Sequence, residues 1–388
     1  MEQSQTNRIL IIAAESSAAI YAAQLMDHWQ ESGRSVSTFG IGDEKMVSKG
    51  FRAVGRAEEL AVVGFWEILK NYSRIKSCFD EIVKELDENL PEAAILIDFP
   101  GFNLRLAKEL KERSIPVIYY VSPQLWAWKQ GRVKKVKAFV DRMLVLFPFE
   151  VDFYKKHGVD AEYVGHPLLE PLKSAESPEI DRQTDRGRFG FQSNDFVLGL
   201  LPGSRRGEID RHLDTHLEVA KEMHKVYGQM KFAICVAPTL DKEDIQSRLG
   251  DIRIPYTLVK KEPFEMIRML DAALVTSGTA TLQVGLMKVP MVIIYKMHWL
   301  TAILARLLVR GTKFFGLVNI IAGREIVPEK FQSQASPSEL VPLLRKIKDD
   351  GSYAEQMRTD LTVMREQMGD HAPTKKVAAV VEEYLDGK

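Results

Sequence analysis

The stretch FVLGLLPGSRRGE, residues 196–208, joins a buried-strand pattern to the start of a helix. Its apolar run, 196–201, is followed by Pro202 and Gly203, and a short apolar run with such a boundary predicts a fully buried strand of a parallel sheet. Parallel strands are usually connected by helices, so one strand-turn-helix unit is expected here. This unit points to an α/β fold with functional loops at the carboxyl ends of its strands.

The same unit recurs on both sides of this stretch. Further strands are predicted downstream at 231–237, 256–259, 272–276 and 290–295. Another series is predicted upstream at 8–14, 35–42, 93–98, 115–122 and 142–147. Helical patterns alternate with these strands, and the chain closes with helices at 337–348, 353–368 and 373–384. We therefore expect two Rossmann-like parallel sheets, in two lobes facing a cleft where ligands bind.

Two lobes also follow from the length of the chain, since 388 residues exceed what one hydrophobic core usually serves. Residues 173–195 are rich in charge and Ser and poor in large apolar side chains, which is typical of a connection. The sequence predicts a first lobe, an interlobe connection, a second lobe, and a C-terminal helix that packs back on the first lobe. Their expected bounds are 1–170, 171–194, 195–365 and 366–388.

The composition excludes several classes of function. Lys plus Arg number 53 and Asp plus Glu also number 53, so no overall electrostatic field would recruit nucleic acid. The cysteines, Cys78 and Cys235, and the histidines lack the spacing of metal ligands, so no metal is expected. The apolar run 9–14 has no basic leader, which argues against a secretion signal. The run 297–305 falls short of the roughly 20 residues of a membrane-spanning helix, so membrane contact is expected to be peripheral.

Two turns of the second lobe have the features of phosphate-binding sites. Gly203 and Ser204 let the backbone approach an anion closely, and Arg205 can bind a diphosphate through two N–H groups. The later run 277–279, Ser-Gly-Thr, repeats this pattern with hydroxyls at a helix start. An ordinary turn and an ordinary capped helix are the alternatives. Two such helix starts in one sheet favour a bound nucleotide diphosphate.

Asp98 is the candidate for acid–base chemistry. It ends a strongly apolar strand pattern and precedes the run 99–103, Phe-Pro-Gly-Phe-Asn. Partial burial there would raise its pKa, so that the carboxylate could take a proton from an attacking hydroxyl. The alternative is an Asx-type turn before Pro100, and the residues alone favour it.

Three segments suit contact with lipid. Tyr120–Trp128 leads into a cationic run, and aromatic rings beside cations suit an anionic amphiphile or a sugar face. Apolar residues recur at near-helical spacing between Leu60 and Leu86, and a second apolar surface surrounds Trp299. A solvated basic helix and helices packed in the core are the alternatives. The cations of the run are Lys129, Arg132, Lys134, Lys135 and Lys137.

Taken in order, eight segments resemble the lipid-A-disaccharide synthase family along nearly the whole chain. No single segment is specific, but the ordered set is. The resemblance implies a GT-B fold, in which two Rossmann-like lobes face a cleft. The segments are Glu59–Gly64, Asp98–Asn103, Tyr120–Trp128, Phe147–Glu150, Tyr163–Pro167, Leu201–Arg205, Ser277–Leu282 and Asn319–Glu325.

This resemblance implies an inverting glycosyltransferase of lipid A biosynthesis that uses no metal or other cofactor. Its donor would be UDP-2,3-diacylglucosamine and its acceptor 2,3-diacylglucosamine 1-phosphate, bound at the inner face of the cytoplasmic membrane. Asp98 matches the family's general base, which would deprotonate the 6-hydroxyl of the acceptor. The implied nucleotide site is Gly203, Ser204, Arg205, Ser277, Gly278, Thr279, Gln283, Asn319 and Glu325. The implied acceptor loop is Glu15, Ser16, Ser17 and Asn103, and the implied membrane or acyl contacts are Val62, Phe65, Trp66, Leu69 and Trp299.

The chain departs from the family pattern at three places, one of which is Val318, where the family commonly has Pro before Asn319. The family usually reads Gly-Glu-x-Ser-Gly-Asp where residues 14–19 read Ala-Glu-Ser-Ser-Ala-Ala, so Ala18 and Ala19 replace Gly and Asp. Gln283 stands where the family usually has Glu, and it keeps an acceptor oxygen without the charge. Three interpretations stay open: an active family member, a transferase with a changed donor or acceptor, and a silent paralogue that still binds nucleotide or lipid.

Overall fold

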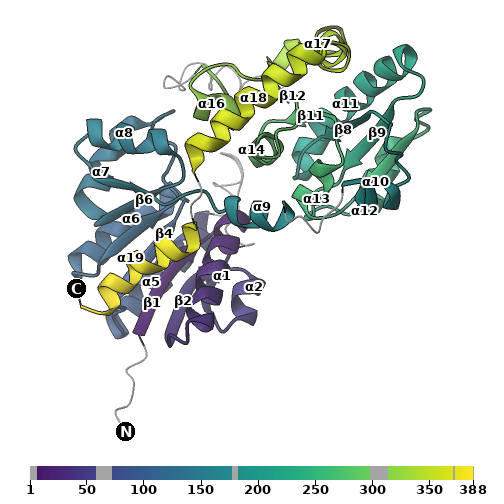
Figure 1. The fold of residues 1–388 in the computed structure, drawn as a ribbon. Helices are drawn as coiled ribbons and strands as arrows, with labels where there is room; N and C mark the ends of the chain where they lie inside the picture. The colour runs from purple at the N-terminus through teal and green to yellow at the C-terminus, as the bar shows by residue number, and fades with distance from the viewer. Residues whose placement is uncertain (1–6, 58–71, 177–181, 298–312, 370–371, 388) are drawn as a thin grey trace. The chain divides into compact units, whose positions relative to one another are not determined.

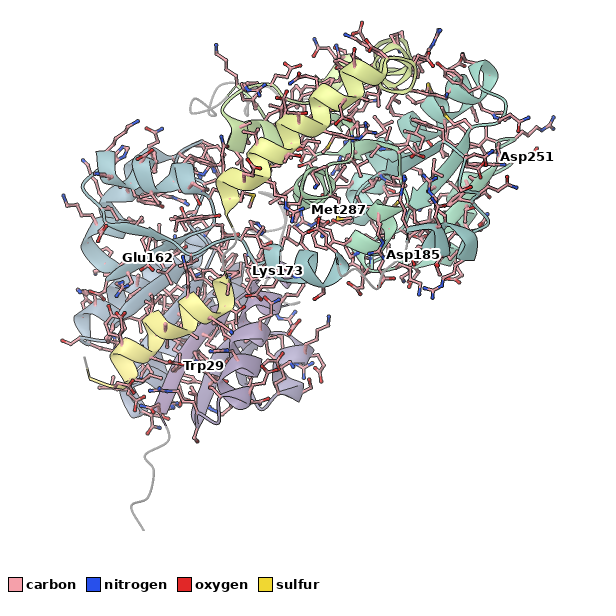
Figure 2. All side chains as sticks on the ribbon, in the orientation of Figure 1. Trp29, Glu162, Lys173, Asp185, Asp251 and Met287 are labelled. Carbon is pink, nitrogen blue, oxygen red and sulfur yellow. The ribbon has the colours of Figure 1, made fainter. Side chains whose placement is uncertain are left out.

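The computed structural model describes residues 7–57, 72–176, 182–297, 313–369 and 372–387, which form two compact units (Figure 1). Unit 1 comprises Met1–Pro167 with Asp370–Lys388, and unit 2 comprises Leu168–Gly369. Side chains with nitrogen and with oxygen atoms are spread over both units (Figure 2). Among the helices described, none is long and apolar enough to cross a membrane.

Unit 1 contains a seven-stranded parallel sheet in the order β3-β2-β1-β4-β5-β6-β7. The middle strands are buried on both faces, and residues 9–12 of β1 are completely buried. Such strands read as continuous apolar runs because helices cover both faces of a parallel sheet. The strands are β1 (Asn7–Ala13), β2 (Val36–Gly42), β3 (Arg52–Arg56), β4 (Ala93–Ile97), β5 (Val117–Tyr120), β6 (Arg142–Val145) and β7 (Ala161–Tyr163).

The helices of unit 1 connect these strands, and the last helix of the chain joins them. That helix, α19, packs against α1, whose Trp29 is only 2% exposed. The helices are α1 (Ser16–Glu31), α2 (Glu44–Ser48), α5 (Tyr72–Glu88), α6 (Pro100–Glu112), α7 (Val133–Phe139), α8 (Pro148–Lys156) and α19 (Pro373–Leu385), with a 3-10 turn, η1 (Gln130–Arg132).

Unit 2 contains a six-stranded parallel sheet in the order β10-β9-β8-β11-β12-β13. Its strands are β8 (Val197–Leu201), β9 (Lys231–Cys235), β10 (Tyr256–Val259), β11 (Ala272–Thr276), β12 (Met291–Tyr295) and β13 (Glu329–Phe331). Its helices are α9 (Leu169–Ala175), α10 (Arg182–Arg188), α11 (Arg206–Val226), α12 (Lys242–Leu249), α13 (Pro263–Arg268), α14 (Thr279–Leu286), α16 (Leu317–Ala322), α17 (Pro337–Asp349) and α18 (Gly351–Met368), with a 3-10 turn, η2 (Gln332–Gln334).

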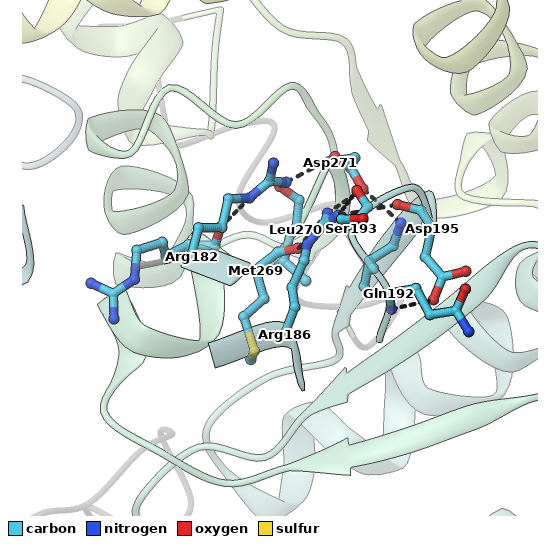
Figure 3. A network of polar contacts seen from close by, with 10 residues as sticks. Arg182, Arg186, Gln192, Ser193, Asp195, Met269, Leu270 and Asp271 are labelled. Atoms are coloured by element: carbon cyan, nitrogen blue, oxygen red, sulfur yellow. Dashed lines mark hydrogen bonds and ion pairs between the residues drawn. The ribbon is translucent and has the colours of Figure 1, made fainter. Parts of the chain in front are cut away.

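Helix α10 lies in the segment expected to connect the lobes, and two ion pairs with Asp271 fasten it to the second sheet within unit 2 (Figure 3). Arg186 is 1% exposed, and its guanidinium donates to the Met269 carbonyl at 2.8 and 3.0 Å and to the Asp271 carboxylate at 2.6 Å. Arg182 donates to the other carboxylate oxygen of Asp271 at 2.8 Å. Asp271 also accepts the backbone N–H of Val197, the first residue of β8. The Asp271 carboxylate therefore joins α10 to the start of the second sheet.

The two parallel sheets confirm the predicted fold class, and all ten predicted strands are present within a few residues of their expected bounds. Three further strands, β3, β7 and β13, were not predicted. They are short and lie at or near sheet edges, where half-buried polar residues replace the continuous apolar run of a central strand.

Candidate active site

In unit 1 the order of the strands reverses between β1 and β4. The chain passes outward from β1 to β2 and β3, then returns to β4 on the other side of β1. Ala13 pairs with Ile97, so the loops after β1 and β4 begin side by side. Open α/β sheets bind ligands at the carboxyl ends of strands at such a switch point. These loops carry Glu15 and Asp98, two of the residues singled out from the sequence.

Asp98 is held in a strained backbone conformation. Its φ is 49° and that of Phe99 is 43°, the left-handed region that non-glycine residues rarely occupy. The Asp98 carbonyl accepts the side-chain amide of Asn103 at 2.7 Å and the hydroxyl of Tyr119 at 2.5 Å. Pro100 begins α6 directly afterwards. Strain of about 1–3 kcal/mol per residue persists only where the surroundings enforce it, and it is concentrated at functional sites.

The electrostatic surroundings of Asp98 weaken it as an acid. Burial raises its pKa from the ordinary 3.8 to about 6, with a further increase from the negative charge of Glu15. A hydrogen bond from the Phe99 backbone opposes both effects. At neutral pH the carboxylate is therefore still ionised, but it accepts a proton more readily than an exposed Asp does.

Tyr21, on α1, lies close to this carboxylate and was not singled out from the sequence. Burial and the charge of Asp98 raise the pKa of Tyr21 to about 12, so it stays protonated. Its ring lies 6.1 Å from that of Tyr120, at the end of β5. Tyr21 and Tyr119 reach Asp98 from different elements, and no sequence motif joins the three residues.

Unit 2 repeats the reversal between β8 and β11. The chain passes from β8 outward to β9 and β10 and returns to β11, and Leu201 pairs with Val275. The two predicted phosphate-binding turns, 202–205 and 277–279, follow these two strands. Glu15 and Asp98 in unit 1, and the two predicted phosphate-binding turns in unit 2, therefore follow the strands at the switch points of their sheets.

The first of these turns is occupied by a side chain of the protein. The Glu208 carboxylate accepts the backbone N–H of Ser204 at 2.8 Å and that of Arg205 at 3.3 Å, and it lies 3.7 Å from the Arg205 guanidinium. Gly203 has φ 132°, and a Cβ there would lie 2.5 Å from the Glu208 Cβ. Glu208 thus stands where a phosphate was expected, and a ligand at these N–H groups must displace it.

The second turn is more open to a ligand. Gly278 and Thr279 are exposed at the start of α14, which has no side-chain cap. Gln283 is half-buried one helical turn beyond Thr279, on the same face of α14. The Ser277 hydroxyl instead donates to the Phe315 carbonyl at 2.9 Å. Gly278, Thr279 and Gln283 therefore share an accessible helix start that can meet an anion with backbone N–H groups.

Asn319 is completely buried and its amide is used inside the protein. The amide nitrogen donates to the Val327 carbonyl at 2.8 Å and the Glu329 carboxylate at 2.7 Å, and the amide oxygen accepts two backbone N–H groups, from Ile326 and Val327. Glu329 in turn accepts the backbone N–H groups of Phe315 and Gly316, each at 2.9 Å. Asn319 therefore holds the 315–316 turn beside Ser277, and Glu329, which was not predicted, completes this support.

The other predicted site residues lie as follows. Ser16 and Ser17 begin α1, and Glu325 is exposed between α16 and β13. Asn103 is completely buried in α6, where it also donates to the Ile97 carbonyl at 3.2 Å, so it supports the end of β4. The expected membrane or acyl contacts, Val62, Phe65, Trp66, Leu69 and Trp299, lie outside the described residues.

The loop that departs from the family pattern is regular in structure. Ala18 lies inside α1 and is not among the residues with positive φ, so glycine is not needed there. Ala19 is completely buried, and its N–H is donated to the Glu15 carbonyl at 2.9 Å. Among the described residues, no group of three His, Cys, Asp or Glu side chains is placed to hold a metal ion.

Signals for the residues that were missed are weak in the sequence. The capping role of Glu208 could be predicted from the sequence, because Glu208 lies three residues after Arg205 and this spacing is typical of a helix-capping carboxylate. Tyr21, Tyr119 and Glu329 reach their partners only through the fold.

Comparison with known proteins places these features in a family. A model of the family described as lipid-A-disaccharide synthetase matches residues 9–381. A relative from Trichlorobacter lovleyi named lipid-A-disaccharide synthase is 38% identical over 381 residues, which cover 98% of this chain and 98% of the relative.

Solved structures resemble the fold at low sequence identity. A UDP-GlcNAc 2-epimerase from Neisseria meningitidis bound to UDP-GlcNAc matches with a TM-score of 0.60 and 10% identity, over 98% of this chain and 99% of that one. The glycotransferase of kitacinnamycin matches with a TM-score of 0.64 and 13% identity, over 98% and 100% of the two chains. At this identity the likeness concerns the fold, two parallel α/β sheets of the GT-B type.

Proposed function

The chain belongs to the lipid-A-disaccharide synthase family, and we propose that it catalyses the family's reaction. It transfers 2,3-diacylglucosamine from UDP to the 6-hydroxyl of 2,3-diacylglucosamine 1-phosphate and forms the β-1,6 disaccharide of lipid A biosynthesis. The observation that carries this proposal is the state of Asp98, a mostly buried carboxylate with a pKa of about 6 at the switch point of unit 1.

Asp98 acts as the general base. Its carboxylate takes the proton of the acceptor's 6-hydroxyl as that oxygen attacks the anomeric carbon of the donor. The bond from the anomeric carbon to the diphosphate breaks in the same displacement, and its electron pair leaves with UDP. Attack from the face opposite the leaving group inverts the anomeric centre. Asn103 and Tyr119 support this step as positioning residues, because both hold the Asp98 carbonyl.

The leaving diphosphate is bound by unit 2. The exposed start of α14, at Gly278 and Thr279, offers backbone N–H groups, and Arg205 offers a guanidinium that is 59% exposed. Gln283 lies one turn further along α14, where an amide can contact a ribose hydroxyl. Ser204 and Gly203 take part if Glu208 moves aside, and Asn319 supports the neighbouring turn. Glu325 is exposed near that turn and completes the proposed nucleotide site.

The protein works peripherally at the inner face of the cytoplasmic membrane, where both acylated substrates reside. Glu15, Ser16 and Ser17 form the acceptor loop beside Asp98 in this proposal. Apolar side chains dock the acyl chains, and the sequence assigns this role to Val62, Phe65, Trp66, Leu69 and Trp299.

Release of UDP tests the reaction. The acylated donor and acceptor are mixed in a neutral detergent, and UDP is followed with and without the acceptor. We expect acceptor-dependent release by the native chain and a loss of about 10²–10⁴-fold in Asp98→Ala, the usual contribution of a general base. Glu44→Gln, an exposed carboxylate of the same unit, serves as the matched control and is expected to retain activity.

Two results contradict this proposal. Full turnover by Asp98→Ala would remove Asp98 from the mechanism. Nucleotide or lipid binding by the native chain without any UDP release would instead support the binding paralogue.

A further inference from the structure

The loop that leaves β5 begins next to Asp98. Ile97 pairs with Tyr120, so the residues that follow β4 and β5 start at adjacent positions on the carboxyl edge of the first sheet. The loop continues through Trp126 and Trp128 to η1 and α7, which carry the cationic run of the sequence. This run has not been assigned a role by the reaction described above.

Lys129 and Arg132 lie on one turn of this loop. The Arg132 N–H is donated to the Lys129 carbonyl at 3.0 Å, and the Lys129 ammonium lies 4.3 Å from the centre of the Trp128 ring. Lys129 has φ 51°, a left-handed conformation, and its side chain is exposed, while Arg132 is half-buried. The fold therefore holds two cations together and supports one of them on an aromatic face.

The two cations repel one another, and the charge of Arg132 also acts on Tyr119 beside Asp98. Burial and the nearby charge of Arg132 lower the pKa of Lys129. The Arg132 charge also extends to the hydroxyl of Tyr119, where it acts against burial and the charge of Asp98 on the pKa of Tyr119. That hydroxyl donates to the Asp98 carbonyl. Arg132 thus acts on the tyrosine that holds the carbonyl of the proposed base.

No carboxylate balances this pair of cations within the described part of the chain, where neither Lys129 nor Arg132 is found in an ion pair. Other arginines of unit 1 do contact carboxylates: Arg113 lies 2.8 Å from Asp87, and Arg142 lies 2.9 Å from Glu162. Two close like charges are unfavourable unless an anion joins them. The arrangement is therefore suited to a ligand with a compact double negative charge.

We propose that Lys129 and Arg132 bind the phosphate group of the acceptor. This inference rests on the proposed function, since that acceptor carries a phosphate monoester at C1. A guanidinium and an ammonium can together donate charge-assisted hydrogen bonds to a phosphate. The phosphate is on C1 and the 6-hydroxyl is on the CH2 group at C5, and both carbons flank the ring oxygen, so a bound phosphate fixes where the 6-hydroxyl lies. Holding the phosphate at Lys129 and Arg132 therefore selects the 6-hydroxyl as the group presented to Asp98.

Equilibrium binding tests this site separately from catalysis. The acceptor and the same lipid without its phosphate are each titrated, in neutral detergent micelles, against the native chain, Lys129→Ala and Arg132→Ala. We expect Arg132→Ala to weaken binding of the phosphorylated lipid about 10- to 100-fold, as for a lost charged hydrogen bond. Binding of the dephosphorylated lipid should change less than about threefold, and Arg132→Lys should restore part of the loss.

The matched control is Lys134→Ala with Lys135→Ala, which removes two exposed cations of the same run on α7. We expect this double variant to bind the phosphorylated acceptor like the native chain. Thermal unfolding of every variant shows whether the fold is intact.

Three outcomes overturn the inference. Equal losses for the phosphorylated and dephosphorylated lipids would mean that the variants damage the loop. An equal loss in the Lys134–Lys135 control would mean an unspecific surface charge. In the third outcome, the variants bind the acceptor normally in neutral micelles and lose binding to phosphatidylglycerol vesicles. That result would assign the two cations to membrane headgroups.

Failure of the proposed function looks different. In that case the native chain releases no UDP, yet phosphate-dependent binding through Lys129 and Arg132 is still measured.

Discussion

Asp98 combines two costs that a folded protein usually avoids. Its backbone and that of Phe99 are left-handed, and its carboxylate is ionised in a mostly buried place. The support for this arrangement is local and polar, because Asn103 and Tyr119 hold its carbonyl. A residue whose backbone conformation and buried charge are energetically unfavourable, yet are held by local hydrogen bonds, is expected to serve the chemistry rather than the stability of the protein.

The pH dependence of turnover follows from this pKa. Below about pH 6 the Asp98 carboxylate becomes protonated and can no longer accept a proton, so kcat/KM should fall about tenfold per pH unit there. Glu15→Gln removes a negative charge that raises the pKa of Asp98, so the fall should begin at lower pH. The measurement is a pH profile of UDP release, with Glu44→Gln as the control. An unchanged profile in Glu15→Gln would show that the two carboxylates are not coupled.

The stability of the protein should respond in the opposite sense. The folded pKa of Asp98 lies above the ordinary value of 3.8, so the folded state binds the extra proton and loses stability as pH rises from about 4 to 6. Asp98→Asn should therefore stabilise the fold at pH 7 by about 1–3 kcal/mol, and this gain should vanish below about pH 4. Urea unfolding at pH 4 and pH 7 measures it. A destabilised Asp98→Asn at pH 7 would argue against the raised pKa.

At the scale of elements, carboxylates of the protein organise both helix starts and loops of unit 2. Glu208 closes the start of α11, and Glu329 with Asn319 holds the turn at 315–316. Asp271 fastens α10 to the second sheet (Figure 3). In each case one acidic side chain accepts backbone N–H groups that have no helical or strand partner.

We therefore expect Asn319 to affect nucleotide binding indirectly, because it holds the 315–316 turn in place. Asn319→Ala leaves the backbone N–H groups of Ile326 and Val327 and the Glu329 carboxylate without their partner, and it should lower the free energy of unfolding by about 2–4 kcal/mol. UDP affinity should fall with it, because the turn beside Ser277 loosens. Urea unfolding and a UDP titration check both effects, with exposed Glu325→Ala as the control for stability. Weaker UDP binding with unchanged stability would show a direct contact instead.

Arg186 should matter for stability alone. Its guanidinium is almost completely buried on Asp271 and the Met269 carbonyl, so Arg186→Met leaves a partly buried carboxylate without one of its two cations. Removing one partner of a buried pair usually costs about 3–5 kcal/mol. Arg188→Ala removes an exposed guanidinium whose partner, Asp185, keeps its ion pair with Arg268, so it should cost less than about 1 kcal/mol. Thermal unfolding of both variants tests this difference, and equal effects would contradict it.

For the whole molecule, the same organisation appears twice. Each unit is a parallel sheet with its strand order reversed once, and Asp98 and the two predicted phosphate-binding turns follow the strands on either side of that reversal. Two departures from the family pattern also fall there, at Ala19 after β1 and at Gln283 after β11. These two substitutions allow a test of whether the family's chemistry depends on the carboxylates that Ala19 and Gln283 replace.

Restoring both carboxylates distinguishes two interpretations of this chain, an active family member and a divergent one. If the native chain is active, Ala19→Asp with Gln283→Glu should raise the rate of disaccharide formation by less than about threefold. Ala19 is completely buried, so Ala19→Asp should also destabilise the fold by about 1–3 kcal/mol. Both single variants serve as controls. A gain of about 100-fold or more would identify the native chain as degenerate or retargeted.

Much of the fold followed from local patterns. The central strands are continuous apolar runs because they are buried on both faces, and the turn residues that end them are visible in the sequence. The short strands β3, β7 and β13 were missed because edge strands lack that pattern. In the candidate site, the positions of Asp98 and Thr279 at strand ends were predictable, whereas the roles of Asn103 and Asn319 as internal supports were not.

The sequence by itself determined where strands end and which residues follow them, because burial and turn formation act over a few neighbouring residues. Only the tertiary structure decided what those residues meet. Glu15 and Asp98 are 83 positions apart, yet they share one electrostatic environment because β1 and β4 are neighbours. Arg132 likewise acts on Tyr119, because the loop that carries Arg132 leaves the end of β5, where Tyr119 lies. A pKa shift, a hydrogen bond or a repulsion between charges depends on the distance between groups in space. The order of strands in the sheet sets that distance, and the pattern of residues along the chain does not contain it.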